Sequence, residues 1–162
     1  MSPVAADDAR RRRRLANELK DSLRELSNQL SLLNHQVGAQ LELKDADLDC
    51  LDLITRHGPM SPTALARRAG LHPATMTGIL DRLQRGGWIT RERDPEATDR
   101  RAVTVRALRD RSAEVFQLYG GMNSKMDELL GGYSAAELEL LLDFLQRTTA
   151  AGQTATSTLA EA

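Results

Sequence analysis

The chain has 162 residues and a formal net charge of −1, and its 41% of hydrophobic and 28% of charged residues are typical of a soluble globular protein. No apolar run approaches the roughly 18 residues that a membrane-spanning helix needs, and the arginines from Arg10 to Arg14 precede polar residues instead of the apolar segment of a secretory signal. The single cysteine, Cys50, excludes an internal disulfide and is typical of a reducing compartment, so we expect a cytoplasmic protein.

The charge is unevenly distributed along the chain. Between residues 56 and 106 there are ten arginines and five acidic residues, whereas the rest of the chain has 12 basic and 18 acidic residues. A basic middle between acidic flanks indicates a polyanionic partner for that middle. Chance clustering of solvated charge is the alternative.

The first predicted element is a long amphipathic helix over residues 15–41, which follows a flexible basic arm at residues 1–14. Its apolar residues recur at steps of three and four and share one stripe: Leu15, Leu19, Leu23, Leu26, Leu30, Leu33, Val37 and Leu41. A helix of this length extends over about 40 Å, which is more than a small domain can cover. We therefore expect the stripe to pack against a partner, most simply a second copy of the chain.

Two shorter helices are predicted between residues 45 and 70. The first, Asp45 to Arg56, ends at the stop signal His57-Gly58-Pro59. The second begins at Ser61-Pro62, because serine is a good N-cap and proline suits the first helical turn, and it closes at Gly70.

A further short helix is predicted from Pro73 to Gly86-Gly87, and the tight turn that separates it from the preceding helix gives the helix-turn-helix layout. Two strands follow, at Trp88–Arg93 and Arg101–Ala107, where apolar and polar residues alternate along the second. The loop between them, residues 94–100, is too polar to be buried.

Two helices complete the predicted fold. Residues 112–130 form one apolar face, and Gly120-Gly121 should weaken or bend that helix. The sequence Ser134-Ala135-Ala136-Glu137 is a capping box that starts the last helix, whose leucines lie on more than one side. Residues 150–162 are small and polar, so we expect a disordered tail.

The helix after Gly70 has two contrasting faces. Met76, Ile79, Leu80 and Leu83 cluster on the side that must face the core. The opposite side is smooth at its start and cationic farther on, with Ala74, Thr75, Thr77, Gly78, Asp81, Arg82 and Arg85. Small residues let a helix approach base edges in a DNA groove, and a helix N-terminus attracts phosphate. The alternative is that Pro73 and the small residues only cap the helix and pack it on its neighbour.

Arg100 and Arg101 lie at the end of the polar loop, where the second strand begins. An arginine that extends from a hairpin can enter the narrow minor groove of DNA, whose potential favours cations. Neighbouring strand residues point in opposite directions, so the two arginines should have different roles, with Arg100 outward. Alternatively, the arginines pair with Asp94 or Asp99 of the same loop.

The stretch from Asp45 to Arg106 resembles the winged helix of MarR-type transcription regulators. The resemblance is carried by HGPMSPTALARRAGLHPATMTGILDRLQRGGWITRERDPEATDRRAVTV, with D-R-L in the helix, G-W-I after it and D-R-R in the wing. The long first helix and the last two helices also match the family's dimerisation elements, so the resemblance covers nearly the whole chain.

The resemblance implies a homodimer that binds a pseudo-palindromic double-stranded operator, usually as a repressor that a small aromatic or phenolic effector releases. It places the helix in the major groove and the wing in the minor groove. The expected DNA-binding residues are Pro73, Ala74, Thr75, Thr77, Gly78, Arg82, Arg100 and Arg101. The chain departs from the family at Gly78, where many relatives have a long polar side chain, and at His72, which replaces a shorter N-cap residue.

We therefore predict a mainly α fold with a small two- to three-stranded β wing, that is, a winged helix-turn-helix plus helical dimerisation elements. Its parts are a winged-helix DNA-binding region at 45–107, a helical dimerisation region at 15–44 and 108–149, the arm and the tail. The alternative function is a winged-helix dimer that serves as a protein-interaction scaffold without DNA binding.

Other features give weaker indications. His35, His57 and His72 are dispersed without metal-ligand spacing, and no nucleophile motif or phosphate-binding glycine loop is present, so we expect no enzyme, no metal and no cofactor. Cys50 is either an oxidant sensor or a small core residue. Asn34 and His35 lie off the leucine stripe and either face an effector site or are solvated. The Arg10–Arg14 run either touches DNA backbone or stays solvated.

Overall fold

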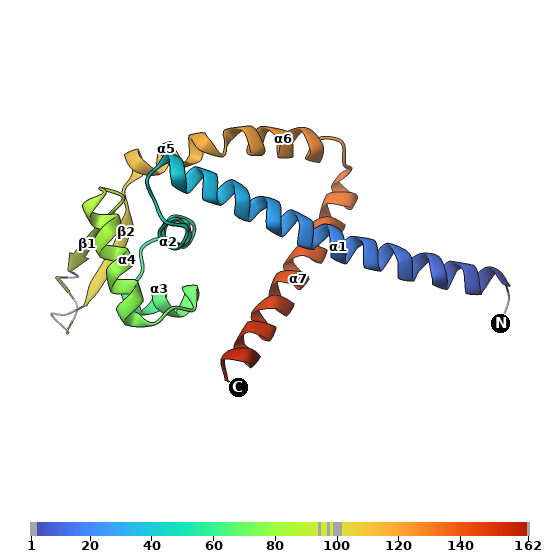
Figure 1. Ribbon diagram of the computed structural model, residues 1–162, viewed down its shortest axis with the longest axis horizontal. Coiled ribbons are helices and arrows are strands. Elements are labelled where there is room, and N and C mark those ends of the chain that lie inside the picture. Colours follow the sequence, from blue (N-terminus) through green and yellow to red (C-terminus); the bar gives the residue numbers. More distant parts are fainter. Residues whose placement is uncertain (1–2, 94, 97, 99–101, 162) are drawn as a thin grey trace. The chain divides into compact units, whose positions relative to one another are not determined.

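The computed structural model describes residues 3–93, 95–96, 98 and 102–161 (Figure 1). These residues form helices and one antiparallel pair of strands. In chain order they are α1 (Pro3–Gln40), α2 (Asp45–His57), α3 (Pro62–Ala69), α4 (Pro73–Arg85), β1 (Ile89–Arg93), β2 (Val103–Ala107), α5 (Arg109–Leu118), α6 (Gly120–Leu130) and α7 (Ala135–Ala160). The chain divides into two compact units, Met1–Leu118 and Tyr119–Ala162.

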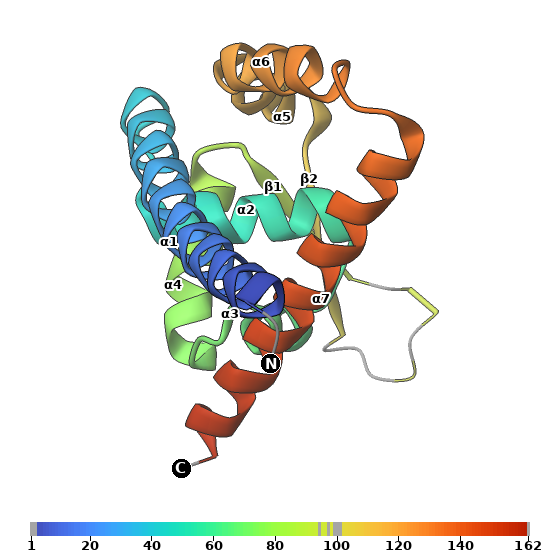
Figure 2. The ribbon, with the colours of Figure 1, turned by 90° about the vertical axis from the view of Figure 1, so that its right-hand side faces the viewer.

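The core of the first unit lies where α2, α3 and α4 meet the hairpin. Helix α2 is seen end-on in Figure 1 and lengthwise in Figure 2, and it contacts α3, α4 and β2. The buried cluster has one aromatic side chain, Trp88, and otherwise aliphatic and sulfur-containing residues: Cys50, Leu51, Ile54, Leu65, Ala66, Met76, Ile79, Leu80, Leu83, Ile89 and Val105. This core holds the helix-turn-helix and the wing base as one body, which confirms the predicted fold class.

The hairpin pairs β1 with β2 from Ile89 opposite Ala107 to Arg93 opposite Val103. A single bridge adds Met60, whose backbone N–H donates to the Val105 carbonyl at 3.2 Å and whose carbonyl accepts from the Val105 N–H at 2.8 Å. The wing sheet therefore has two strands and a one-residue third member, as the sequence predicted.

The predicted helix ends are also present. The Ser61 hydroxyl accepts a hydrogen bond from the Ala64 N–H at 3.1 Å, and Gly70 adopts the left-handed conformation (φ 66°) that favours glycine at a helix end. Ser134 and Glu137 form the complete capping box of α7. The helix predicted over residues 112–130 is interrupted at Tyr119, next to the glycine pair, and so becomes α5 and α6.

Two predictions of disorder were wrong. Helix α1 begins at Pro3, so residues 3–14 of the expected flexible arm are helical. Arginine is a good helix former, and adding residues to an existing helix is far easier than starting one. Helix α7 runs to Ala160, through most of the expected disordered tail. The threonine hydroxyls there donate to carbonyls four residues earlier, as from Thr154 to Ala150 at 3.1 Å, so these polar side chains are accommodated within the helix.

Candidate nucleic-acid interface

Helix α4 is fixed on one side and open on the other. Met76, Ile79, Leu80 and Leu83 are buried, as predicted from their spacing. The opposite side begins with exposed Pro73, Ala74, Thr75 and Thr77 and continues with half-buried Gly78 and Arg82. The six α4 residues expected to bind DNA therefore share one accessible side of a helix that the core holds in place.

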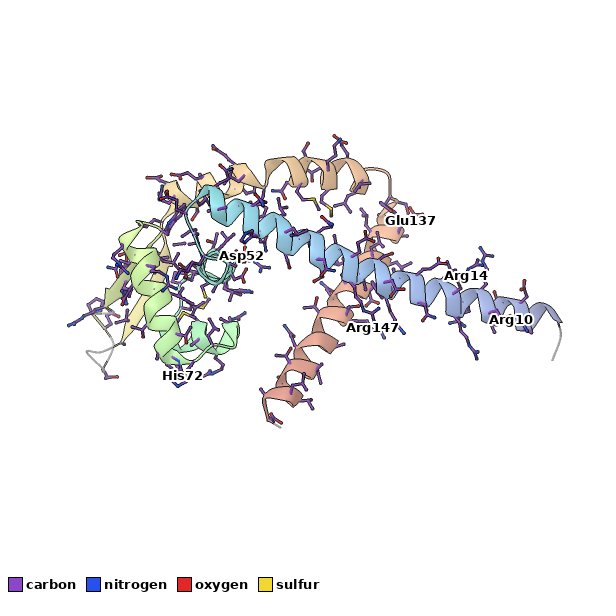
Figure 3. All side chains as sticks on the ribbon, viewed as in Figure 1. Arg10, Arg14, Asp52, His72, Glu137 and Arg147 are labelled. Atoms are coloured by element: carbon purple, nitrogen blue, oxygen red, sulfur yellow. The ribbon has the colours of Figure 1, made fainter. Side chains whose placement is uncertain are left out.

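The start of α4 is organised by His72, which Figure 3 labels at the tip of the helix. Its Nδ1 accepts a hydrogen bond from the Ala74 N–H at 3.1 Å, so histidine replaces the usual short capping residue. The Thr77 hydroxyl donates to the Pro73 carbonyl at 3.1 Å, which leaves its oxygen lone pairs and methyl group on the exposed side. The first turn carries no acidic residue, so the partial positive charge of the helix N-terminus is not cancelled there.

Arg82 has an ion-pair partner that the sequence analysis missed. Its Nε and Nη2 donate to Oδ2 and Oδ1 of Asp47 at 2.9 and 2.8 Å, which is a bidentate pair between α4 and α2. The Asp47 side chain is only 3% exposed, against 37% for Arg82. The hydrogen bond to Asp47 raises the pKa of Arg82 above its ordinary value. A signal was present, because Asp47 lies four and seven residues before Leu51 and Ile54 and therefore falls on their buried stripe.

Arg91 connects the wing to α4. From strand β1 it donates to the Gln84 side chain at 2.6 Å and pairs with the Asp81 carboxylate. These three side chains and Arg85 line an open cavity of about 480 Å³. Arg91 therefore fixes the base of the wing against the exposed side of α4, a role that the spacing of charges did not predict.

The predicted wing-tip residues lie outside the described part of the chain. This applies to Arg100 and Arg101, and to the acidic residues Asp94 and Asp99 that were considered as their partners. Their orientation, including the outward position expected for Arg100, stays a prediction.

The two effector-site candidates, Asn34 and His35, do not line the same cavity. Asn34 lines a cavity of about 430 Å³ that α1 shares with α2 and α3, where Asp49, Cys50 and Arg68 also lie. His35 instead places Nδ1 at 3.0 Å from the exposed Asp45 carboxylate. Burial, followed by the nearby charges of Asp45 and Asp52, raises the pKa of Asp49.

A third cavity lies within the first unit, between the end of α2 and the start of α5. It has a volume of about 590 Å³ and a mostly apolar lining that includes Ile54, Pro59, Ala107 and Leu108. Within residues 3–93, 95–96, 98 and 102–161, no group of three metal-ligating side chains is present. None of the helices described there could serve as a membrane span.

Comparisons with known proteins agree on one family. The sequence profile described as "MarR family" matches residues 43–103. The chain is 33% identical over 116 residues to the HTH-type transcriptional regulator YcgE of Bacillus subtilis, which covers 71% of this chain and 74% of that protein. It is also 33% identical over 86 residues to the HTH-type transcriptional repressor YetL of Bacillus subtilis, which covers 53% of this chain and 50% of that protein.

Solved structures share the fold. A MarR family protein from Bacillus stearothermophilus superimposes with a TM-score of 0.66 at 18% identity, over 87% of this chain and 97% of that one. RV1404 from Mycobacterium tuberculosis gives a TM-score of 0.62 at 23% identity, over 84% and 93% of the two chains. These similarities extend beyond the winged helix to most of the helical remainder.

Proposed function

This chain belongs to the MarR family of transcriptional regulators, and we propose that it is a homodimer that binds a pseudo-palindromic operator as a repressor and is released by a small effector. The observation that supports DNA binding best is the accessible side of α4, from Pro73 to Arg82, on a helix whose other side is buried. A rigid helix with small residues at its start suits the major groove. We infer a cytoplasmic location, since the single cysteine is typical of a reducing compartment.

The proposed contacts divide between two grooves. Pro73, Ala74, Thr75, Thr77 and Gly78 approach base edges and nearby phosphates in the major groove, and Arg82 lies farther along the helix. Arg100 and Arg101 reach the minor groove from the wing, where the negative potential favours arginine. Arg91 supports this division because it holds the wing base against α4.

Dimerisation is proposed from exposed apolar side chains. Helices α5, α6 and α7 have no buried residue in the described chain, and Leu129 and Leu140 are largely exposed. A partner that covers these side chains would also set the distance between the two α4 helices. That distance must be about 34 Å for both helices to meet successive major grooves.

Repression is supported by the similarity to YetL, whose name states that it is a repressor. Release is supported by the cavities of about 430 and 590 Å³, which are of a size that accepts a small molecule. A ligand bound in either cavity would change the spacing of the α4 helices and so lower the affinity for DNA.

Selection of bound fragments from random duplexes tests the proposal directly. We expect an inverted repeat with half-site centres about one helical turn apart, and an affinity that falls steeply as salt rises, because several arginines displace counterions from phosphates. A flat salt response, or no binding at low salt, would instead favour the protein-interaction scaffold.

The wing contact has its own test. We expect Arg100→Ala to weaken operator binding by about 1 to 3 kcal/mol for each lost contact. Sedimentation should show the same oligomeric state as the wild type. If the variant loses dimerisation, or binds the operator as tightly as the wild type, Arg100 does not have the proposed role.

A further inference from the structure

The nitrogens of the Arg82 guanidinium group have two different surroundings. Nε and Nη2 are occupied by the Asp47 carboxylate, at 2.9 and 2.8 Å. Nη1 makes no hydrogen bond within the described part of the chain. It lies where the side chain of residue 78 would project, since a Cβ built on Gly78 would be 3.6 Å from it.

Gly78 and Arg82 are four residues apart, so they occupy one side of α4, and Thr75 lies on the same side seven residues before Arg82. The absence of a side chain at Gly78 leaves Nη1 accessible beside residues proposed to enter the groove. A longer residue at this position would cover it.

Asp47 is the reason that the arginine has a fixed orientation. An arginine on a helix surface normally samples many rotamers, and fixing it costs entropy when it binds a partner. Here a buried carboxylate from another helix, 3% exposed, holds two of its nitrogens, so the third has a defined direction before DNA arrives.

We propose that Asp47 is a positioning residue for DNA recognition, which holds Arg82 so that Nη1 donates, through the gap at Gly78, to a phosphate oxygen of the operator. This inference rests on the proposed function. Phosphate is the favoured acceptor because Arg82 lies in the second half of α4, whereas the N-terminal residues of a recognition helix are those that reach base edges.

The same geometry has an electrostatic consequence. The Asp47 carboxylate balances the charge of Arg82, so the contact supplies a directed hydrogen bond but displaces little of the counterion atmosphere. Removal of the carboxylate charge would leave Arg82 uncompensated near the DNA. The dependence of affinity on salt would then become steeper, by about 0.9 in the slope of log affinity against log salt per protomer.

The experiment compares full-length wild type with Asp47→Asn, Arg82→Gln, Arg82→Lys and the double variant Asp47→Asn/Arg82→Gln. Affinity for a selected operator and for a random duplex is measured across a range of salt, below the unfolding midpoint of each variant. Asp47→Asn should steepen the salt slope, by about 2 per dimer. Arg82→Gln should weaken binding about tenfold on both duplexes, as expected when a phosphate contact is lost.

Two of these variants separate the positioning of Arg82 from its charge and from folding. Arg82→Lys keeps the charge but cannot reach Asp47 and DNA together, so it should bind as weakly as Arg82→Gln. The double variant has an amide pair without charge, and its salt slope should return to that of wild type even if Asp47→Asn alone is too unstable to measure. Asp52→Asn, which removes an exposed carboxylate from α2 (Figure 3), controls for net charge and should leave the slope near that of wild type.

The outcomes that overturn the inference differ from those that overturn the function. If wild type binds the operator and Arg82→Lys restores full affinity, or if the Asp47 and Arg82 variants lose only stability, the pair serves folding alone and the inference fails. A change of preference at one base pair in Arg82→Gln would place Nη1 on a base edge and overturn the phosphate assignment. If wild type binds no DNA, the proposed function fails, and the inference fails with it.

Discussion

Cys50 illustrates how burial determines the chemistry of a side chain. It is 1% exposed within the core between α2 and its neighbours. Burial, with smaller contributions from the carboxylates of Asp49 and Asp47, raises the pKa of the Cys50 thiol to about 11. A thiol that stays protonated at neutral pH is a poor nucleophile and is slow to react with oxidants, so the core interpretation of Cys50 is favoured over the sensor.

This shift predicts how stability depends on pH. The unfolded thiol ionises near its ordinary pKa of 9.0, whereas the folded thiol keeps its proton to about 11. Above pH 9 the unfolded state therefore binds fewer protons than the folded state, and the free energy of unfolding should fall as pH rises through this range, by about 1 to 2 kcal/mol. Urea unfolding at several pH values, followed by circular dichroism, measures this decrease.

Cys50→Ala provides the control. The variant should be less stable than wild type at pH 8, because it leaves a small cavity, but it should lose less stability between pH 9 and 11. Other groups that titrate in this range contribute equally to both proteins and cancel in the difference. Equal slopes for the two proteins would mean that the thiol has the same pKa in the folded and unfolded states.

Ion pairs between individual side chains also limit what a count of charged residues can predict. The excess of arginine between residues 56 and 106 pointed to a polyanion. Within the part of that range that the structure describes, however, Arg56, Arg82, Arg91 and Arg106 pair with carboxylates. The partners of Arg82 and Arg91 come from other elements, 35 and 10 residues away in sequence. Contacts of this kind depend on how helices pack, which local spacing does not reveal.

At the scale of elements, the junction between α4 and β1 is held by an arginine from α5. The Arg111 guanidinium lies 3.9 Å from the centroid of the Trp88 ring, and its Nη2 donates to the Gly86 carbonyl at 3.2 Å. Gly86 is pressed against the same ring, since a Cβ there would come within 2.7 Å of Trp88 Cδ1. The start of α5, the end of α4 and the base of the wing are therefore mutually fixed.

Two glycines of this region should respond oppositely to alanine. Gly86→Ala forces the buried Trp88 ring to move and should destabilise the protein by about 1 to 3 kcal/mol. Gly78→Ala meets only an ordinary contact inside α4 and should stabilise the protein by up to about 1 kcal/mol, because alanine is the better helix former. Urea unfolding followed by fluorescence measures both, since Trp88 is the only tryptophan.

The two variants also control for each other, because each adds one methyl group near the same helix. If both destabilise the protein, Gly78 has a close neighbour that the structure does not contain. If both are neutral, the ring of Trp88 can move without cost, and the junction is less rigid than its contacts indicate.

Helix ends were predicted correctly where they are determined by residues close in sequence. The caps at Ser61 and Ser134 bond to backbone groups three residues away, and Gly70 needs only its own φ, so sequence alone located these helices. The extents of α1 and α7 were not predicted. Polar composition indicated disorder at residues 3–14 and 150–160, but both stretches extend long helices that were already formed.

At the scale of the whole molecule, the two units differ in how many of their apolar side chains are buried. The first has a closed core around α2, whereas no described residue of α6 or α7 is buried. Several large apolar side chains of the second unit are widely exposed, with Leu140 at 69% and Leu159 at 78%. Exposed apolar surface on this scale is typical of an interface. The helices of this unit, of 11 and 26 residues, have no buried side chain and therefore lack the tertiary packing that supplies most of the stability of a helix in water.

The second unit should therefore be ordered only in the dimer, and a charge on its apolar surface should separate the protomers. We expect Leu142→Asp to shift the protein from dimer to monomer in sedimentation and to lower operator affinity, because two half-sites are then bound independently.

Wild type should melt at a higher temperature as its concentration rises, since each tenfold increase adds about 1.4 kcal/mol to the stability of a dimer that unfolds on dissociation. Arg147→Gln changes the net charge by the same amount at a position of α7 that is 80% exposed and lies on another side of the helix, five residues from Leu142, and should leave the oligomeric state and operator affinity unchanged. A dimeric Leu142→Asp protein, or a wild type whose melting temperature is independent of concentration, would show that other side chains form the interface.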